Sequence, residues 1–100
     1  MTNSFEGILT PTLTPFTESG ELYERGFEHL FSFLADNDVN GVFLGGSYAA
    51  FPLLSEEERM RVTAISISLA KKYKLQCVAH IGHASTKLAL QLEIPVRDWP

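Results

Sequence analysis

Short apolar segments alternate with helical patterns along this chain, and that alternation constrains its fold more than any other feature. Three segments have the length and the flanking glycine or proline that are typical of buried strands: Gly7–Thr10, Val39–Leu44 and Leu75–Ile81. The order strand, helix, strand, helix, strand, helix indicates parallel strands joined by right-handed crossovers. The pattern predicts an α/β fold and leaves a doubly wound sheet, a flavodoxin-like domain and a barrel equally open.

The helices between these segments have clear boundaries in the sequence. The first has apolar residues at i, i+3, i+4 and i+7, the spacing of one buried face: Phe27, Leu30, Phe31 and Leu34. The second begins with a capping box made by Ser55 and Glu58 and runs to about Lys72. A third helix is expected to start at Ser85 or Thr86.

Parallel α/β folds bind ligands at the carboxyl ends of their strands. The candidate site loops are therefore Thr10–Phe16, Gly45–Phe51 and Ile81–Ser85. In the second loop, Ser47 offers a small hydroxyl that suits a carboxylate ligand, although the residue pattern alone favours a turn role. Tyr48 is equally consistent with a pocket residue and with a core residue that packs on Phe51.

Four segments of the chain occur in the order and spacing of a known family. They are Gly7-Ile8 leading to Thr14-Pro15-Phe16, Val39–Leu44, Phe51–Arg59, and Val78–Gly82 followed by Ser85-Thr86. On these segments the chain resembles the pyruvate-dependent Schiff-base aldolases, the family of dihydrodipicolinate synthase and N-acetylneuraminate lyase. The resemblance implies a (β/α)8 TIM barrel, a homo-oligomer, and a lysine that forms an imine with pyruvate before reaction with an aldehyde.

The substrate loop departs from the motif of the aldolases, which is a glycine, two hydroxyl residues, a glycine and a glutamate. Those five positions are Gly46, Ser47, Tyr48, Ala49 and Ala50 here. The resemblance implies that Ser47 and Tyr48 bind the carboxylate of the 2-keto acid. Because Tyr48 is larger than the usual threonine and two alanines replace the glycine and the glutamate, a divergent branch with another aldehyde or 2-keto acid is expected.

The chemistry that the resemblance implies is incomplete in this chain. The imine-forming lysine and proton-relay tyrosine of the family lie on later strands, beyond Pro100. The four lysines present are expected on helical surfaces or helix ends: Lys71, Lys72, Lys74 and Lys87. A barrel needs over ~200 residues, so residues 1–92 are interpreted as the amino-terminal part of an aldolase barrel with no catalytic residue of its own. The alternative is a non-enzymatic remnant, or a small subunit that completes a barrel with a partner.

Residues 93–100 form an atypical tail. Pro95 interrupts the third helix, where the family expects small residues followed by a glycine and an alanine. One permitted set of codons for Glu93 to Pro100 reads, in a shifted frame, as Asp-Thr-Gly-Ala-Gly-Leu-Ala, which restores that pattern. A frameshift near Leu92 is therefore one hypothesis, and a genuine short chain or a fragment is the other.

Composition and charge exclude several other functions. The chain has 8 basic and 12 acidic residues, a net charge of −4 and no long apolar run, so neither nucleic acid nor a membrane is an expected partner. The single cysteine, Cys77, cannot form an internal disulfide, which favours the cytoplasm. His80 and His83 have a spacing that invites a metal site, but no cysteine or carboxylate nearby completes a ligand set. No metal and no cofactor are predicted.

Overall fold

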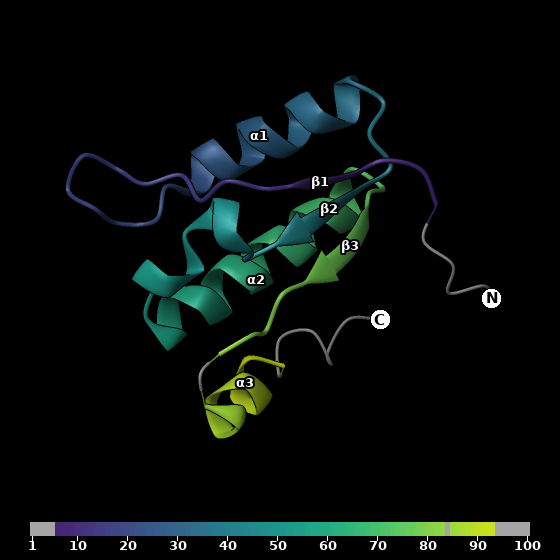
Figure 1. Cartoon of the computed structure of the whole chain (residues 1–100). Coiled ribbons are helices and arrows are strands. Elements are labelled where there is room, and N and C mark those ends of the chain that lie inside the picture. Colours follow the sequence, from purple (N-terminus) through teal and green to yellow (C-terminus); the bar gives the residue numbers. More distant parts are fainter. Residues whose placement is uncertain (1–5, 84, 94–100) are drawn as a thin grey trace.

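The computed structural model describes residues 6–83 and 85–93 and contains a small parallel sheet with helices packed against it (Figure 1). The strands are β1 (Leu9–Pro11), β2 (Gly41–Leu44) and β3 (Gln76–Ala79), and the α-helices are α1 (Glu24–Asp36), α2 (Glu56–Lys72) and α3 (Thr86–Leu92). Two single-turn 3-10 helices, η1 (Ser47–Ala49) and η2 (Phe51–Leu53), follow β2. The expected break at Pro95 and the hypothesis of a shifted frame concern residues that lie almost entirely outside the described part of the chain.

The sheet confirms the predicted alternation of strands and helices. Its order is β1-β2-β3, and both strand pairs are parallel. Val42 at the centre is aligned with Thr10 on one side and Cys77 on the other. Since β1–α1–β2 and β2–α2–β3 are both crossover units, the carboxyl ends of all three strands meet at one end of the sheet.

The core lies between the sheet and the first two helices. Phe27 and Phe31 from α1 and Val42 and Leu44 from β2 are all fully buried. Helices α1 and α2 pack against each other beside the sheet (Figure 1). Because side chains of a strand alternate between faces, Phe43 points to the side opposite Val42 and Leu44, and it is only half-buried.

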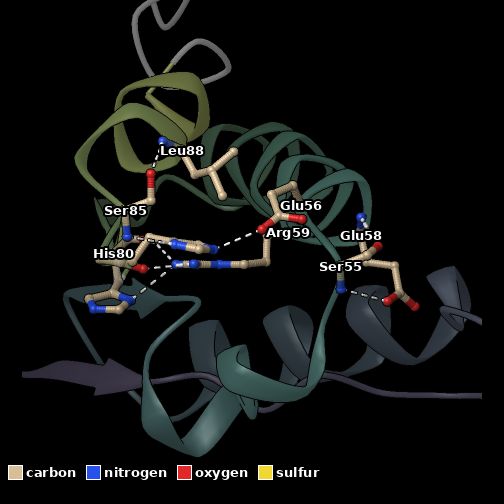
Figure 2. Close-up of polar contacts among 9 residues, drawn as sticks. Ser55, Glu56, Glu58, Arg59, His80, Ser85 and Leu88 are labelled. Atoms are coloured by element: carbon tan, nitrogen blue, oxygen red, sulfur yellow. Dashed lines mark hydrogen bonds and ion pairs between the residues drawn. The ribbon is translucent and has the colours of Figure 1, made fainter.

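The second helix has the start and the end that the sequence predicts. Ser55 Oγ accepts a hydrogen bond from the Glu58 N–H at 3.1 Å, and the Glu58 carboxylate accepts one from the Ser55 N–H at 2.9 Å (Figure 2). At the other end, Lys72 donates to Glu28 of α1, which also accepts from the Tyr73 hydroxyl at 2.7 Å. The capping box thus fixes where α2 begins, close to the carboxyl ends of the strands.

Two remaining features bear on the classes of function considered above. Cys77 packs against the core, and burial raises the pKa of its thiol to about 11, so it is not an activated nucleophile. Among the described helices, none has both the length and the apolar character that a membrane span requires.

Candidate functional site

The three loops that follow the strands are joined by hydrogen bonds, as expected for the carboxyl end of a parallel sheet. The Thr14 hydroxyl, in the loop after β1, donates to the Ala49 carbonyl of η1 at 2.7 Å. The His80 N–H, directly after β3, donates to the carbonyl of Leu44, the last residue of β2, at 2.9 Å, and the His80 side chain contacts the carbonyl of Gly45, the first residue of the loop. The loop after β2 is therefore held on both sides by its neighbours.

Ser47 and Tyr48 lie together on η1, at the carboxyl end of β2. Both side chains are exposed, and Tyr48 retains 74% of its accessible surface. Tyr48 thus does not pack into the core beside Phe51, so that alternative is wrong. Together with Pro11 and Leu13, Tyr48 lines a hollow of about 320 Å³. Two hydroxyl groups are therefore available to a ligand beside an apolar hollow.

Arg59 is a buried cation in the first turns of α2, with 5% of its surface exposed. Its guanidinium donates to the Gly82 carbonyl at 2.7 Å and to the His80 carbonyl at 3.4 Å, and it lies 4.9 Å from the centre of the Phe51 ring. Burial lowers the pKa of Arg59, and the charge of Glu56 opposes that effect. Arg59 thus links α2 to the loop after β3.

His80 crosses in the other direction, from β3 to the loop after β2. Its Nδ1 lies 2.9 Å from the Gly45 carbonyl, and its ring centre lies 4.5 Å from that of Phe51. A carbonyl oxygen only accepts hydrogen bonds, so Nδ1 carries the hydrogen. Figure 2 shows the Arg59 side chain reaching from α2 to His80.

His83 has a structural partner of its own. Its Nε2 lies 2.8 Å from a Glu56 carboxylate oxygen, and its Nδ1 accepts from the Ser85 N–H at 3.0 Å. Ser85 in turn caps α3 by accepting from the Leu88 N–H (Figure 2). The two histidines thus serve different contacts, and the described residues contain no group of three or more histidine, cysteine or acidic side chains placed to hold a metal.

The sequence predicted the three loops and named Ser47 and Tyr48 as candidates, but it left the exposure of Tyr48 open and did not predict the contacts of Arg59 and His80. In the sequence, Arg59 is notable only as the last residue of a family segment, and His80 only as a member of another such segment and as half of a histidine pair. Arg59 lies one turn after the N-cap of a helix that is only weakly amphipathic, so the sequence pattern does not indicate that its side chain is buried. Its partners are backbone carbonyls, which have no signature in the sequence.

Comparison with known proteins decides the family. The model of the dihydrodipicolinate synthetase family matches residues 4–97. The chain belongs to this family. Over 87 residues it is 34% identical to 4-hydroxy-tetrahydrodipicolinate synthase from Methanococcus aeolicus, covering 87% of this chain and 30% of that enzyme. It is also 30% identical to N-acetylneuraminate lyase from Escherichia coli, covering 99% of this chain and 33% of that lyase.

Solved structures of the dihydrodipicolinate synthetase family agree with the observed fold. N-acetylneuraminate lyase from Mycoplasma synoviae superposes with a TM-score of 0.86 at 26% identity, over 95% of this chain and 33% of that one. CdNal from Clostridium difficile, in complex with mannosamine, superposes with a TM-score of 0.90 at 26% identity, over 97% of this chain and 33% of that one. The three strand–helix units are thus part of a (β/α)8 TIM barrel, and the chain spans about a third of the length of these relatives.

Acidification is expected to destabilise the chain through Glu28 and Glu56. Hydrogen bonds from Lys72 and then Tyr73 lower the pKa of Glu28 below 4.5. The Glu56 backbone N–H and then His83 lower the pKa of Glu56 in the same way. A carboxyl group with a depressed folded-state pKa contributes stability that is present above its unfolded pKa and lost as the pH falls through its folded pKa.

The urea midpoint should therefore fall as the pH drops below about 4.5, and the fall should be shallower in a Glu28→Gln, Glu56→Gln double variant. Urea titrations followed by circular dichroism between pH 5 and pH 3 measure how the midpoint changes with pH in each protein. Equal slopes for the two proteins would contradict the assignment to these carboxylates. A Glu18→Gln, Glu57→Gln variant, altered at two exposed carboxylates with no hydrogen bond among the described contacts, is the matched control.

Proposed function

We propose that this chain is the amino-terminal part of a carbon–carbon lyase, an aldolase that acts on pyruvate or a related 2-keto acid together with an aldehyde. The family supports the reaction class, because the relatives of this chain include a 4-hydroxy-tetrahydrodipicolinate synthase and an N-acetylneuraminate lyase. The observation that carries the proposal to this chain is the exposed pair Ser47 and Tyr48 at the carboxyl end of β2. In this proposal the complete protein is a cytoplasmic homo-oligomer that needs no cofactor.

The role of the hydroxyl pair is to bind the carboxylate of the 2-keto acid. A short Ser47 side chain brings its hydroxyl close to the backbone, where neighbouring N–H groups can share the anion. The Tyr48 phenol donates from further out, so the bound acid would lie between the backbone of η1 and the Tyr48 ring. Such a clamp orients the keto carbon towards an amine supplied from elsewhere in the barrel.

The amine is expected to come from outside these residues. Lys71 and Lys72 are exposed at the end of α2, Lys74 follows that helix, and Lys87 is exposed on α3. Lys71, Lys72 and Lys74 precede β3 and so lie at the amino end of the sheet, whereas imine chemistry belongs at the carboxyl end. The isolated chain is accordingly proposed to bind the keto acid without forming an imine.

A pyruvate titration of the purified, ¹⁵N-labelled chain tests the binding role. Amide signals of residues 46–50 should shift on addition of pyruvate, and Ser47→Ala should weaken binding about tenfold, because a hydrogen bond to a charged group contributes about 1.5 kcal/mol. Ser19→Ala, at an exposed serine far along the loop after β1, is the control. An absence of shifts at these amides at saturating pyruvate would overturn the carboxylate role.

Reduction with borohydride in the presence of pyruvate tests the second half of the proposal. Mass spectrometry should find no pyruvyl adduct on the 100-residue chain. A stable adduct on any of its lysines would show that the chain carries its own imine-forming residue. A full-length relative of the family, treated in the same way, is the positive control.

The open sheet favours a second candidate function, that of a subunit which completes a barrel with a partner. Among the described elements, β1 and β3 each pair on one side only. Pro11 at the end of β1 and Leu13 just after it are also exposed. Sedimentation of the purified chain distinguishes the two candidate functions. A defined assembly of copies would favour the barrel-completing subunit, and a monomer would favour the amino-terminal part of an aldolase.

A further inference from the structure

Arg59 and His80 together join the loop after β2 to the loop after β3. We propose that they are positioning residues for the keto-acid site, which hold the segment Gly45–Phe51 so that Ser47 presents its hydroxyl in a fixed place. The proposal rests on the function proposed above for Ser47. Neither side chain is assigned contact with the substrate.

His80 anchors the beginning of this segment. The Nδ1–H of His80 donates to the Gly45 carbonyl at 2.9 Å, two residues before Ser47. Gly45 has φ +66°, the left-handed region that glycine enters without strain, so the chain turns sharply at this residue. A turn made by glycine has little stiffness of its own, and the bond from His80 supplies the restraint.

Phe51 anchors the end of the segment between the same two side chains. Its ring centre lies 4.5 Å from that of His80, and the Arg59 guanidinium lies 4.9 Å from it. A guanidinium against an aromatic face is attractive, and more so where water is excluded. Five residues, including Ser47 and Tyr48, thus lie between two points that are fixed by one pair of side chains.

Arg59 also fixes His80 itself. Its guanidinium donates to the His80 and Gly82 carbonyls, so the backbone that carries the imidazole is tied to α2. Arg59 Nη2 also lies 3.4 Å from His80 Nδ1, but both atoms carry hydrogens when Nδ1 donates to Gly45, so this contact is not a hydrogen bond. Burying a guanidinium costs desolvation free energy, which its hydrogen bonds to carbonyls offset. Arg59 therefore stabilises the backbone of the loop after β3 and does not form half of an ion pair.

Two variants of His80 separate the hydrogen bond from simple packing. His80→Asn retains an N–H donor near the position of Nδ1, whereas His80→Leu fills similar space without a donor. We expect His80→Leu to raise amide hydrogen exchange in residues 46–50 and to weaken pyruvate binding, each by fivefold to tenfold, the scale of one lost hydrogen bond. His80→Asn should restore most of the exchange protection and most of the pyruvate binding. Arg59→Lys should loosen the segment, because a single ammonium group cannot bind two carbonyls and cover the Phe51 ring.

The outcomes distinguish this proposal from the function on which it rests. If the wild-type chain binds pyruvate and His80→Leu leaves loop exchange and binding unchanged, the positioning role is wrong and the binding role stands. If exchange rises in His80→Leu but the wild-type chain does not bind pyruvate, the segment is held as proposed and the binding role is wrong.

A measurement on the wild-type chain keeps the proposal testable where a variant does not fold. Long-range ¹H–¹⁵N spectra of histidine-labelled protein should show a hydrogen on Nδ1 of His80. His83, whose Nδ1 accepts from Ser85, should show the opposite tautomer and serves as the internal control. A hydrogen on Nε2 alone of His80 would overturn the bond to Gly45 and with it the proposal.

Discussion

Replacing Phe31 with alanine is expected to lower the free energy of unfolding by about 3–5 kcal/mol, the range for deleting a buried aromatic side chain. Phe31 is fully buried in α1 and belongs to the cluster that includes Val42 and Leu44 of the central strand. Domains of this size are stable by only about 5–15 kcal/mol, so the loss removes a large part of the total. The variant should therefore unfold at a much lower urea concentration than the wild-type chain.

The matched control is Phe33→Ala in the same helix. Phe33 retains 62% of its accessible surface, so its removal should change the stability by less than about 0.5 kcal/mol. Urea denaturation followed by circular dichroism at 222 nm measures both variants. Similar losses at Phe31 and Phe33 would mean that α1 does not present the face seen here to the sheet.

Phe31 and Phe33 also show why so much of the fold was predictable. The spacing of four residues indicated one buried helical face: Phe27, Leu30, Phe31 and Leu34. The structure buries three of them in α1 and packs the partly buried Leu30 against the core. The capping box at Ser55 was equally readable, because it depends on two residues three apart in the sequence. Local patterns of this kind encode elements and their faces, and the order of elements then limits the topology.

The contacts that shape the candidate site could not be predicted in the same way. His80 and Gly45 are 35 residues apart, and Arg59 and Gly82 are 23 apart, so neither pair leaves a local pattern. In both pairs one partner is a backbone carbonyl, which every residue has. Pattern alone left a barrel and two other folds equally open, and the family resemblance favoured the barrel because its segments carry order and spacing over most of the chain.

The fate of Tyr48 illustrates the same limit at the level of one side chain. An aromatic residue beside Phe51 was as consistent with core packing as with a pocket. The loop after β2 decides between them: Ala49 is buried while Tyr48 is exposed, because η1 turns the two side chains in different directions. The direction of each side chain depends on the turn geometry, including φ +60° at Ala50, which cannot be predicted from the sequence pattern.

Replacing Gly41 with alanine is the second substitution with a large expected effect. Gly41 opens the central strand and is aligned with Leu9 on one side and Gln76 on the other. An added Cβ would lie 2.5 Å from Leu9 Cδ2, and 2.8 Å from both the Gln76 Cβ and the Gln76 carbonyl oxygen. The leucine side chain can move, but the carbonyl belongs to the neighbouring strand, so the strands must separate.

We expect Gly41→Ala to cost about 1–3 kcal/mol, the range for overpacking a well-filled interior. Gly20→Ala is the informative control, because no atom lies within 4 Å of its added Cβ while its φ of +88° makes alanine strained there. Its cost should be only about 1 kcal/mol, from backbone strain alone. In ¹H–¹⁵N spectra, Gly41→Ala should shift the amides of Leu9 and Thr10 and of residues 76–79, on both sides of β2, whereas Gly20→Ala should leave them in place. Unchanged strand amides in Gly41→Ala would mean that the three strands are not packed at this register. The candidate site at their carboxyl ends, which depends on that register, would then be wrong.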